Sequence, residues 1–192
     1  MSDVLVLGPQ FRFPNIRDAL ARTGLSGPVV TITAGWQERE GELAALEGHL
    51  GHPVRDLRLY ERAEAVFNQD AELHETHRRR QADLRRLQEL YRIRLSHAKA
   101  AARELFATGE DSELMRNARR AALSAIRRLD AEHLKAIGRI HARWDARLGV
   151  RTRPVLARQL EELETLIEKA GVVCLAGGHV AVLLNRLRLF GL

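Results

Sequence analysis

Two glycines and a histidine near the end of the chain are the residues best suited to bind an anion. Gly177, Gly178 and His179 lie between an apolar run at 172–176 and an amphipathic segment that continues to residue 192. At the start of a helix, unpaired N–H groups and the helix dipole favour negative charge. The sequence therefore predicts a turn that holds an anion. A plain strand-to-helix turn is the alternative. His179 is a weaker candidate for a general base, because the sequence identifies no acid partner for it.

Trp36 and Glu38 follow another apolar run, residues 29–33. Ligands of open α/β sheets bind outside the carboxyl ends of the strands. Trp36 and Glu38 are therefore predicted to line the same crevice as Gly178. Alternatively, Glu38 lies in the first turn of a helix, where the dipole favours a carboxylate.

A basic stripe runs through the middle of the chain, where Arg78, Arg85, Arg92 and Lys99 recur every seven residues. Such a stripe could contact nucleic-acid phosphates. A solvated helix flank with ion pairs to Glu and Asp is the alternative that we favour. His74 and His77 share a helix face, but a metal site needs further ligands. We expect neither a metal nor another cofactor.

Around these residues, the apolar runs predict four parallel strands near 3–7, 29–33, 54–59 and 172–176, separated by helices. The first helix is expected to begin at an Asn15 cap. Residues 59–105 lack Gly and Pro and keep a heptad spacing, which predicts one long helix. A second is expected over 113–148, with Ser112 or Asp111 as its cap, and a third over 155–170.

These elements predict an α/β fold, a parallel sheet with flanking helices, interrupted by a long antiparallel helical hairpin that resembles a coiled coil. The α/β domain comprises 1–59 and 151–192, and the hairpin insertion comprises 60–150. In this arrangement Cys174 is a buried strand thiol rather than a nucleophile.

Three short motifs, "VLVLG", "TITAGW" and "AGVVCLAGGHVAVLLNRLRLFGL", together resemble the N-terminal part of the class I glutamine amidotransferase-like fold. The branch that they resemble most is that of peptidase E and cyanophycinase, which are serine hydrolases. The resemblance covers about half of the chain and implies that Gly177, Gly178 and His179 lie beside the nucleophile and help to hold the oxyanion. The serine elbow that this family carries after its next strand is not found here. The resemblance therefore implies the N-terminal part of such an enzyme, inactive as this chain.

The composition leaves two further functions open. The chain of 192 residues has a formal net charge of +6, and its charge excess lies in the middle segment, which raises nucleic acid as a partner, although not the favoured one. The long apolar seam of the hairpin favours a protein partner or a second copy, so an interaction or assembly protein is the main alternative. The lone cysteine and the absence of a signal peptide or membrane span predict a cytoplasmic protein without a membrane partner.

Overall fold

The computed structural model describes residues 4–10, 12–149 and 153–192. The chain forms two compact units, one of Met1–Asp70 with Val150–Leu192 and the other of Ala71–Gly149. Most of the described residues are helical, and a small sheet of three strands lies in the first unit. Among the described helices, none is long and apolar enough to cross a membrane.

The sheet consists of β1 (Val29–Ile32), β2 (Arg55–Asp56) and β3 (Val172–Leu175), in the order β2-β1-β3. Both pairs are parallel, and Val29 is opposite Val172. Three of the four predicted strands are therefore present, although the predicted 54–59 strand is reduced to two residues.

The predicted strand near 3–7 is wrong for residues 4–7, which form no strand, while residue 3 lies outside the described residues. The apolar alternation of Val4, Leu5, Val6 and Leu7 suggested a buried strand. Val4 and Val6 are instead 87% and 89% exposed, and only Leu7 packs against the core cluster. A strand is stabilised by a backbone neighbour and a covered face, and this segment has neither.

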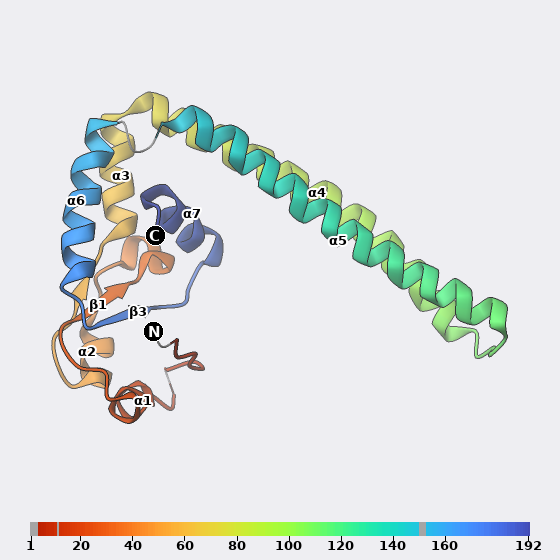
Figure 1. Cartoon of the computed structure of the whole chain (residues 1–192), viewed down its shortest axis with the longest axis horizontal. Helices are drawn as coiled ribbons and strands as arrows, with labels where there is room; N and C mark the ends of the chain where they lie inside the picture. Colours follow the sequence, from red (N-terminus) through yellow and green to blue (C-terminus); the bar gives the residue numbers. More distant parts are fainter. Residues whose placement is uncertain (1–3, 11, 150–152) are drawn as a thin grey trace. The chain divides into compact units, whose positions relative to one another are not determined.

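The helices of the first unit surround the sheet (Figure 1). They are α1 (Ile16–Thr23), the 3-10 segment η1 (Ala34–Arg39), α2 (Ala44–Leu50), α3 (Leu59–Gln69), α6 (Pro154–Glu168) and α7 (Val180–Phe190). Asn15 is the N-cap residue of α1, as predicted, but its side chain accepts no capping hydrogen bond from the helix. The Gln10 side chain caps α1 instead, accepting from the backbone N–H groups of Asn15 and Ile16.

The core of the first unit lies on both faces of the sheet. On one face, Val29 packs with Ile16 of α1 and Leu50 of α2, and Val172 and Cys174 border this cluster. On the other face, Val30 and Ile32 are buried, and α3 contacts both α6 and α7. Burial of the alternate side chains of β1 on opposite faces follows from the two-residue period of a strand.

The second unit contains two long helices, α4 (Ala71–Ala107) and α5 (Glu113–Leu148), which pack against each other. The predicted helix over 113–148 and its Ser112 cap are confirmed. The single helix predicted over 59–105 is wrong, because α3 ends at Gln69. Asp70 leaves the helical conformation with φ −129° and ψ 87°, and its carboxylate pairs with Arg153 at 2.6 Å.

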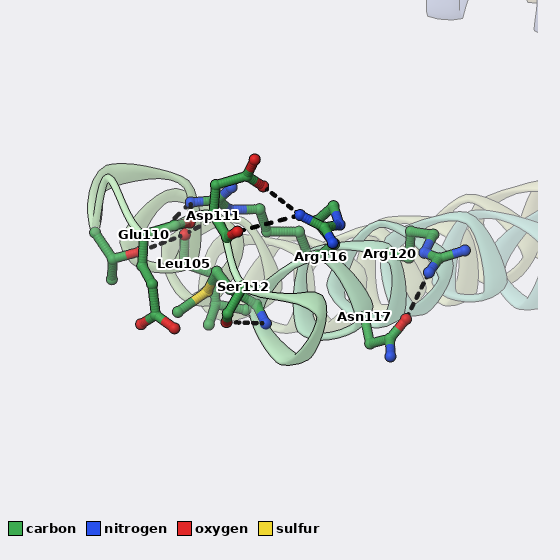
Figure 2. A network of polar contacts seen from close by, with 10 residues as sticks. Leu105, Glu110, Asp111, Ser112, Arg116, Asn117 and Arg120 are labelled. Atoms are coloured by element: carbon green, nitrogen blue, oxygen red, sulfur yellow. Dashed lines mark hydrogen bonds and ion pairs between the residues drawn. The ribbon is translucent and has the colours of Figure 1, made fainter.

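The turn between α4 and α5 is stabilised by arginine side chains (Figure 2). Arg119 donates to the backbone carbonyls of Leu105 and Glu110, which lie before and within the turn. Arg116 pairs with Asp111 at 2.8 Å. The bond to Leu105 satisfies a carbonyl group that the end of α4 leaves without a helical partner.

Candidate functional site

The candidate site lies where β1 and β3 end, because parallel neighbours bring their carboxyl ends to one edge of the sheet. Segment η1 leaves β1 at this edge, and the glycine turn leaves β3. The backbone N–H of His179 donates to the Gly35 carbonyl at 2.8 Å. The Trp36 indole donates to the Gly177 carbonyl at 2.9 Å. The structure thus brings Trp36 and the predicted turn into direct contact.

Close contact between two backbones leaves little room for a side chain on either side of this edge. A Cβ atom on Gly178 would lie 2.5 Å from the carbonyl oxygen of Gly35, and one on Gly35 would lie 3.2 Å from the Cα of Gly178. Gly178 also has a φ of +148°, a conformation that L-residues rarely adopt. Any side chain at Gly178 must therefore push the turn away from η1.

The three residues of the turn differ in what they can still bind. In the described part of the chain, the N–H groups of Gly177 and Gly178 have no acceptor, whereas that of His179 is committed to Gly35. The imidazole Nδ1 of His179 accepts from the Val182 N–H at 3.3 Å and so caps α7. In the neutral ring this bond places the proton on Nε2. His179 therefore begins the helix, and two backbone donors remain for a ligand.

Glu38 is held by α3 rather than by the glycine turn. Its carboxylate accepts from the Tyr60 hydroxyl at 2.9 Å. A hydrogen bond from its own backbone, followed by the one from Tyr60, lowers the pKa of Glu38. The same bond raises the pKa of Tyr60 above its usual value, with a smaller contribution from burial. Both effects keep Glu38 ionised and Tyr60 protonated.

Asp56 is a site residue that the sequence did not suggest. Its carboxylate accepts from the hydroxyls of Thr31 and Thr33, at 2.8 and 2.7 Å, and from the Arg58 N–H. Both threonines are fully buried. The cluster thus ties the end of β1 to β2 beneath the start of η1. Threonine is common in strands, so these two residues carried no signal of a polar cluster.

Segment η1, which leads away from the site, has a strained backbone at one residue. Gln37 adopts φ 59° and ψ −123°, in a region that side chains disfavour, at a cost on the order of 1–3 kcal/mol. Nearby, Glu40 accepts from the N–H groups of Tyr60 and Glu61 and so caps α3. Burial raises the pKa of Glu40, and these two bonds oppose the rise.

The structure brings no candidate nucleophile to this edge among the described residues. The backbone of Ser26 lies against Gly171, just before β3 begins, at the opposite edge of the sheet. Ser112 caps α5, and Ser96 and Ser124 lie within the long helices. Cys174 lies inside β3, and burial raises the pKa of its thiol. Donors for an oxyanion are therefore present without a group that attacks a carbonyl.

The remaining predicted site residues lie in the second unit, on α4. Arg78 is 3.7 Å from Glu75, and the exposed side chains of Arg85, Arg92 and Lys99 contact no carboxylate among the described residues. No group of three or more His, Cys, Asp and Glu side chains is placed to hold a metal in the described ranges.

Comparison of the chain with models of protein families, with curated proteins and with solved structures found no match. Function is therefore inferred from the geometry of the two units.

Proposed function

We propose that the first unit binds the carboxylate or oxyanion of a ligand at the Gly177–Gly178 turn. In this proposal the unit is the N-terminal part of a serine hydrolase of the glutamine amidotransferase-like, peptidase E-like class. The supporting observation is a pair of backbone N–H groups without acceptors at the start of α7, in the described part of the chain. The contacts with Gly35 and Trp36 hold these groups in a fixed position. Such fixed donors bind developing negative charge without reorganising.

The proposed activity of this chain is binding without turnover. Acyl transfer needs a nucleophile and a base within reach of the oxyanion donors. The described serines lie elsewhere, and Nδ1 of His179 already caps a helix. We therefore expect no peptidase or amidase activity and no stoichiometric labelling by a fluorophosphonate probe. We place this function in the cytoplasm, because a single cysteine fits a reducing compartment.

The test is an NMR titration of the full chain with acetate and with inorganic phosphate at constant ionic strength. The amide resonances of Gly177 and Gly178 and the indole N–H of Trp36 should shift in a saturable manner. Gly178→Ala should abolish these shifts, because the new methyl group displaces the turn from η1. Gly48→Ala is the matched control, because a Cβ at Gly48 meets open space. If these resonances instead shift without saturating, and by equal amounts in Gly178→Ala and Gly48→Ala, a binding site at the turn is excluded.

A second candidate function, assembly with another copy through the α4–α5 hairpin, is favoured by an apolar groove. The groove has a volume of about 540 Å³ and lies between the two helices. Leu90 and Ile93 border it and are 44% and 56% exposed. A two-helix hairpin cannot cover such side chains by itself, and burying them against a second hairpin would be favourable.

Light scattering after size exclusion tests this assembly. We expect a dimer or higher oligomer, converted to monomer by Leu90→Glu with Ile93→Glu. Leu134→Glu is the control, since Leu134 is equally apolar and 67% exposed but does not line the groove. A wild-type monomer at high micromolar concentration, or equal dissociation by the control, would count against the groove as an interface.

A further inference from the structure

The positive charge of the chain is confined to the second unit. Residues 71–149 contain 18 Lys and Arg residues against 11 Asp and Glu, a difference of +7, whereas the whole chain has a formal charge of +6. The remainder therefore carries −1. A charge excess of this size on two packed helices produces a local potential that attracts polyanions.

Several arginines of the second unit form ion pairs with carboxylates of the same unit. Arg79 pairs with Glu75, Arg86 with Glu89, Arg94 with Glu132, Arg116 with Asp111, and Arg143 with Asp83. Eight other cations are exposed and have no hydrogen-bond or ion-pair partner in the part of the chain that the structure describes: Arg85, Arg92, Lys99 and Arg103 of α4, and Arg127, Lys135, Arg139 and Arg147 of α5. The ion pairs that the sequence analysis favoured are therefore present for Arg78 but not for Arg85, Arg92 and Lys99.

The four cations on α4 form a nearly straight line. Seven residues fall about 20° short of two helical turns and advance about 10.5 Å, so Arg85, Arg92 and Lys99 follow one another along the helix. Arg103 comes one turn later. From Arg85 to Arg103 the line spans about 27 Å.

Contacts between the helices place Arg127 on the same side of the hairpin as this line. Tyr91 donates to Asp130, and Gln88 contacts His133, on one flank of the helix pair. Arg85 and Arg92 lie three residues before and four after Gln88, and Arg127 lies three before Asp130, so helical spacing puts them along that flank. We call this surface, formed by Arg85, Arg92, Lys99, Arg103 and Arg127, the basic flank.

The opposite flank has a different character. There Arg94 pairs with Glu132, and Asp83 pairs with Arg143, so two of the cations on this side are compensated. The apolar groove bordered by Leu90 also lies on this side. The uncompensated cations of α4 in the described residues are therefore gathered on the basic flank, whereas Arg139 of α5 lies at the groove on the opposite side.

We propose that the basic flank binds double-stranded nucleic acid through its phosphates. Arginine recognises phosphate oxygens with a planar fork of donors, and a row of exposed cations gains affinity by releasing the counterions of a duplex. The described hairpin offers no row of aromatic rings on which successive unpaired bases could stack. Of its Phe, Tyr and Trp side chains, only Phe106 is largely exposed, at 52%. Tyr91 is stacked on His133, Phe106 lies under Arg119, and Trp144 is buried. These contacts favour a duplex over a single strand.

The experiment measures fluorescence anisotropy of a duplex DNA of about 20 base pairs with the full chain, between about 50 and 300 mM NaCl. Four or five phosphate contacts predict a slope of log Kobs against log salt of about −3.6 to −4.5. Replacing Arg85, Arg92 and Lys99 together by Gln should weaken binding at least about tenfold and make the slope less negative by about 2.7. The control replaces Arg128, Lys135 and Arg139 by Gln, an equal loss of charge away from the flank. Circular dichroism verifies that both variants remain helical.

Several results would overturn the proposal. Absence of binding at about 50 mM NaCl would do so, as would equal weakening by the control variant, which would attribute binding to net charge alone. A single strand bound more tightly than the duplex would also contradict it. Vesicles of phosphatidylcholine with phosphatidylserine form the last arm, because the exposed Leu123 and Leu134 of α5 are side chains that a bilayer surface could bury. Binding to these vesicles without binding to the duplex would assign the flank to lipid.

Discussion

Removal of the Asp56 carboxylate should destabilise the first unit more than the loss of a partly buried side chain usually does. In Asp56→Ala, the hydroxyls of Thr31 and Thr33 lose their acceptor. Both threonines are 0% exposed in the intact structure, so their hydroxyls depend on this carboxylate for a partner. A buried polar group without a partner costs about 1–3 kcal/mol. Two such groups predict a loss of about 2–6 kcal/mol in the free energy of unfolding.

Two further substitutions should restore part of the stability that Asp56→Ala loses. Replacing Thr31 and Thr33 by Val in the Asp56→Ala background removes the unsatisfied hydroxyls while keeping their volume. The triple variant should therefore be more stable than Asp56→Ala alone, since removal of both partners of a hydrogen bond is nearly neutral.

Urea denaturation followed by the fluorescence of Trp36 measures these differences, in a Trp144→Phe background that leaves Trp36 as the only tryptophan. Glu168→Ala, which removes an exposed carboxylate outside the cluster, should change stability by less than about 0.5 kcal/mol. A loss below about 1 kcal/mol for Asp56→Ala, or a triple variant less stable than the single one, would refute the reasoning.

Further variants test other parts of the structure. Gly178→Ala should lower the midpoint of urea unfolding, whereas Gly48→Ala in α2 should raise it slightly, because helix interiors favour alanine; equal midpoints would contradict the close contact with η1. The raised pKa of Glu40 means that its ionised form is disfavoured by folding, so the stability of the wild type relative to Glu40→Gln should fall as pH rises from 4.5 through that raised pKa. A difference that is flat or grows with pH would show the opposite sign. Residues 71–149 alone should give a strongly helical circular dichroism spectrum, and a disordered spectrum would contradict the division into units. Cys174 should react with a disulfide reagent more slowly in the folded chain than in urea, because burial raises its pKa and restricts access.

The elements that the sequence predicted well are those with strong local signals. The apolar runs that became β1 and β3 are bounded by glycine, and α5 begins at a serine cap and ends at Gly149, which is left-handed with φ 50°. The rule that parallel strands end at one edge placed the residues after β1 near the glycine turn. Trp36 contacts this turn, whereas Glu38 bonds to Tyr60 of α3 instead.

The features that sequence analysis missed depend on partners far along the chain. The break at Asp70 has no Gly or Pro signal, and the carboxylate there pairs with Arg153, 83 residues later. The Thr31 and Thr33 hydroxyls find Asp56 only after β1 and β2 have paired. Side-chain exposure, rather than residue type, separates Val4 from the buried valines of β1.

The pairing of β1 with β3 has a consequence for synthesis on the ribosome. Val29 is opposite Val172, 143 residues later, and the whole of the second unit is translated between them. Pairing over such a separation carries a large loop-closure entropy and is slow, whereas the contacts within α4 and α5 are closer in sequence. The long helices can therefore fold first and reduce the length of flexible chain between β1 and β3. Until β3 is synthesised, the edge of β1 that pairs with it remains unpaired. During that interval this edge is the part of the chain that most needs protection from aggregation.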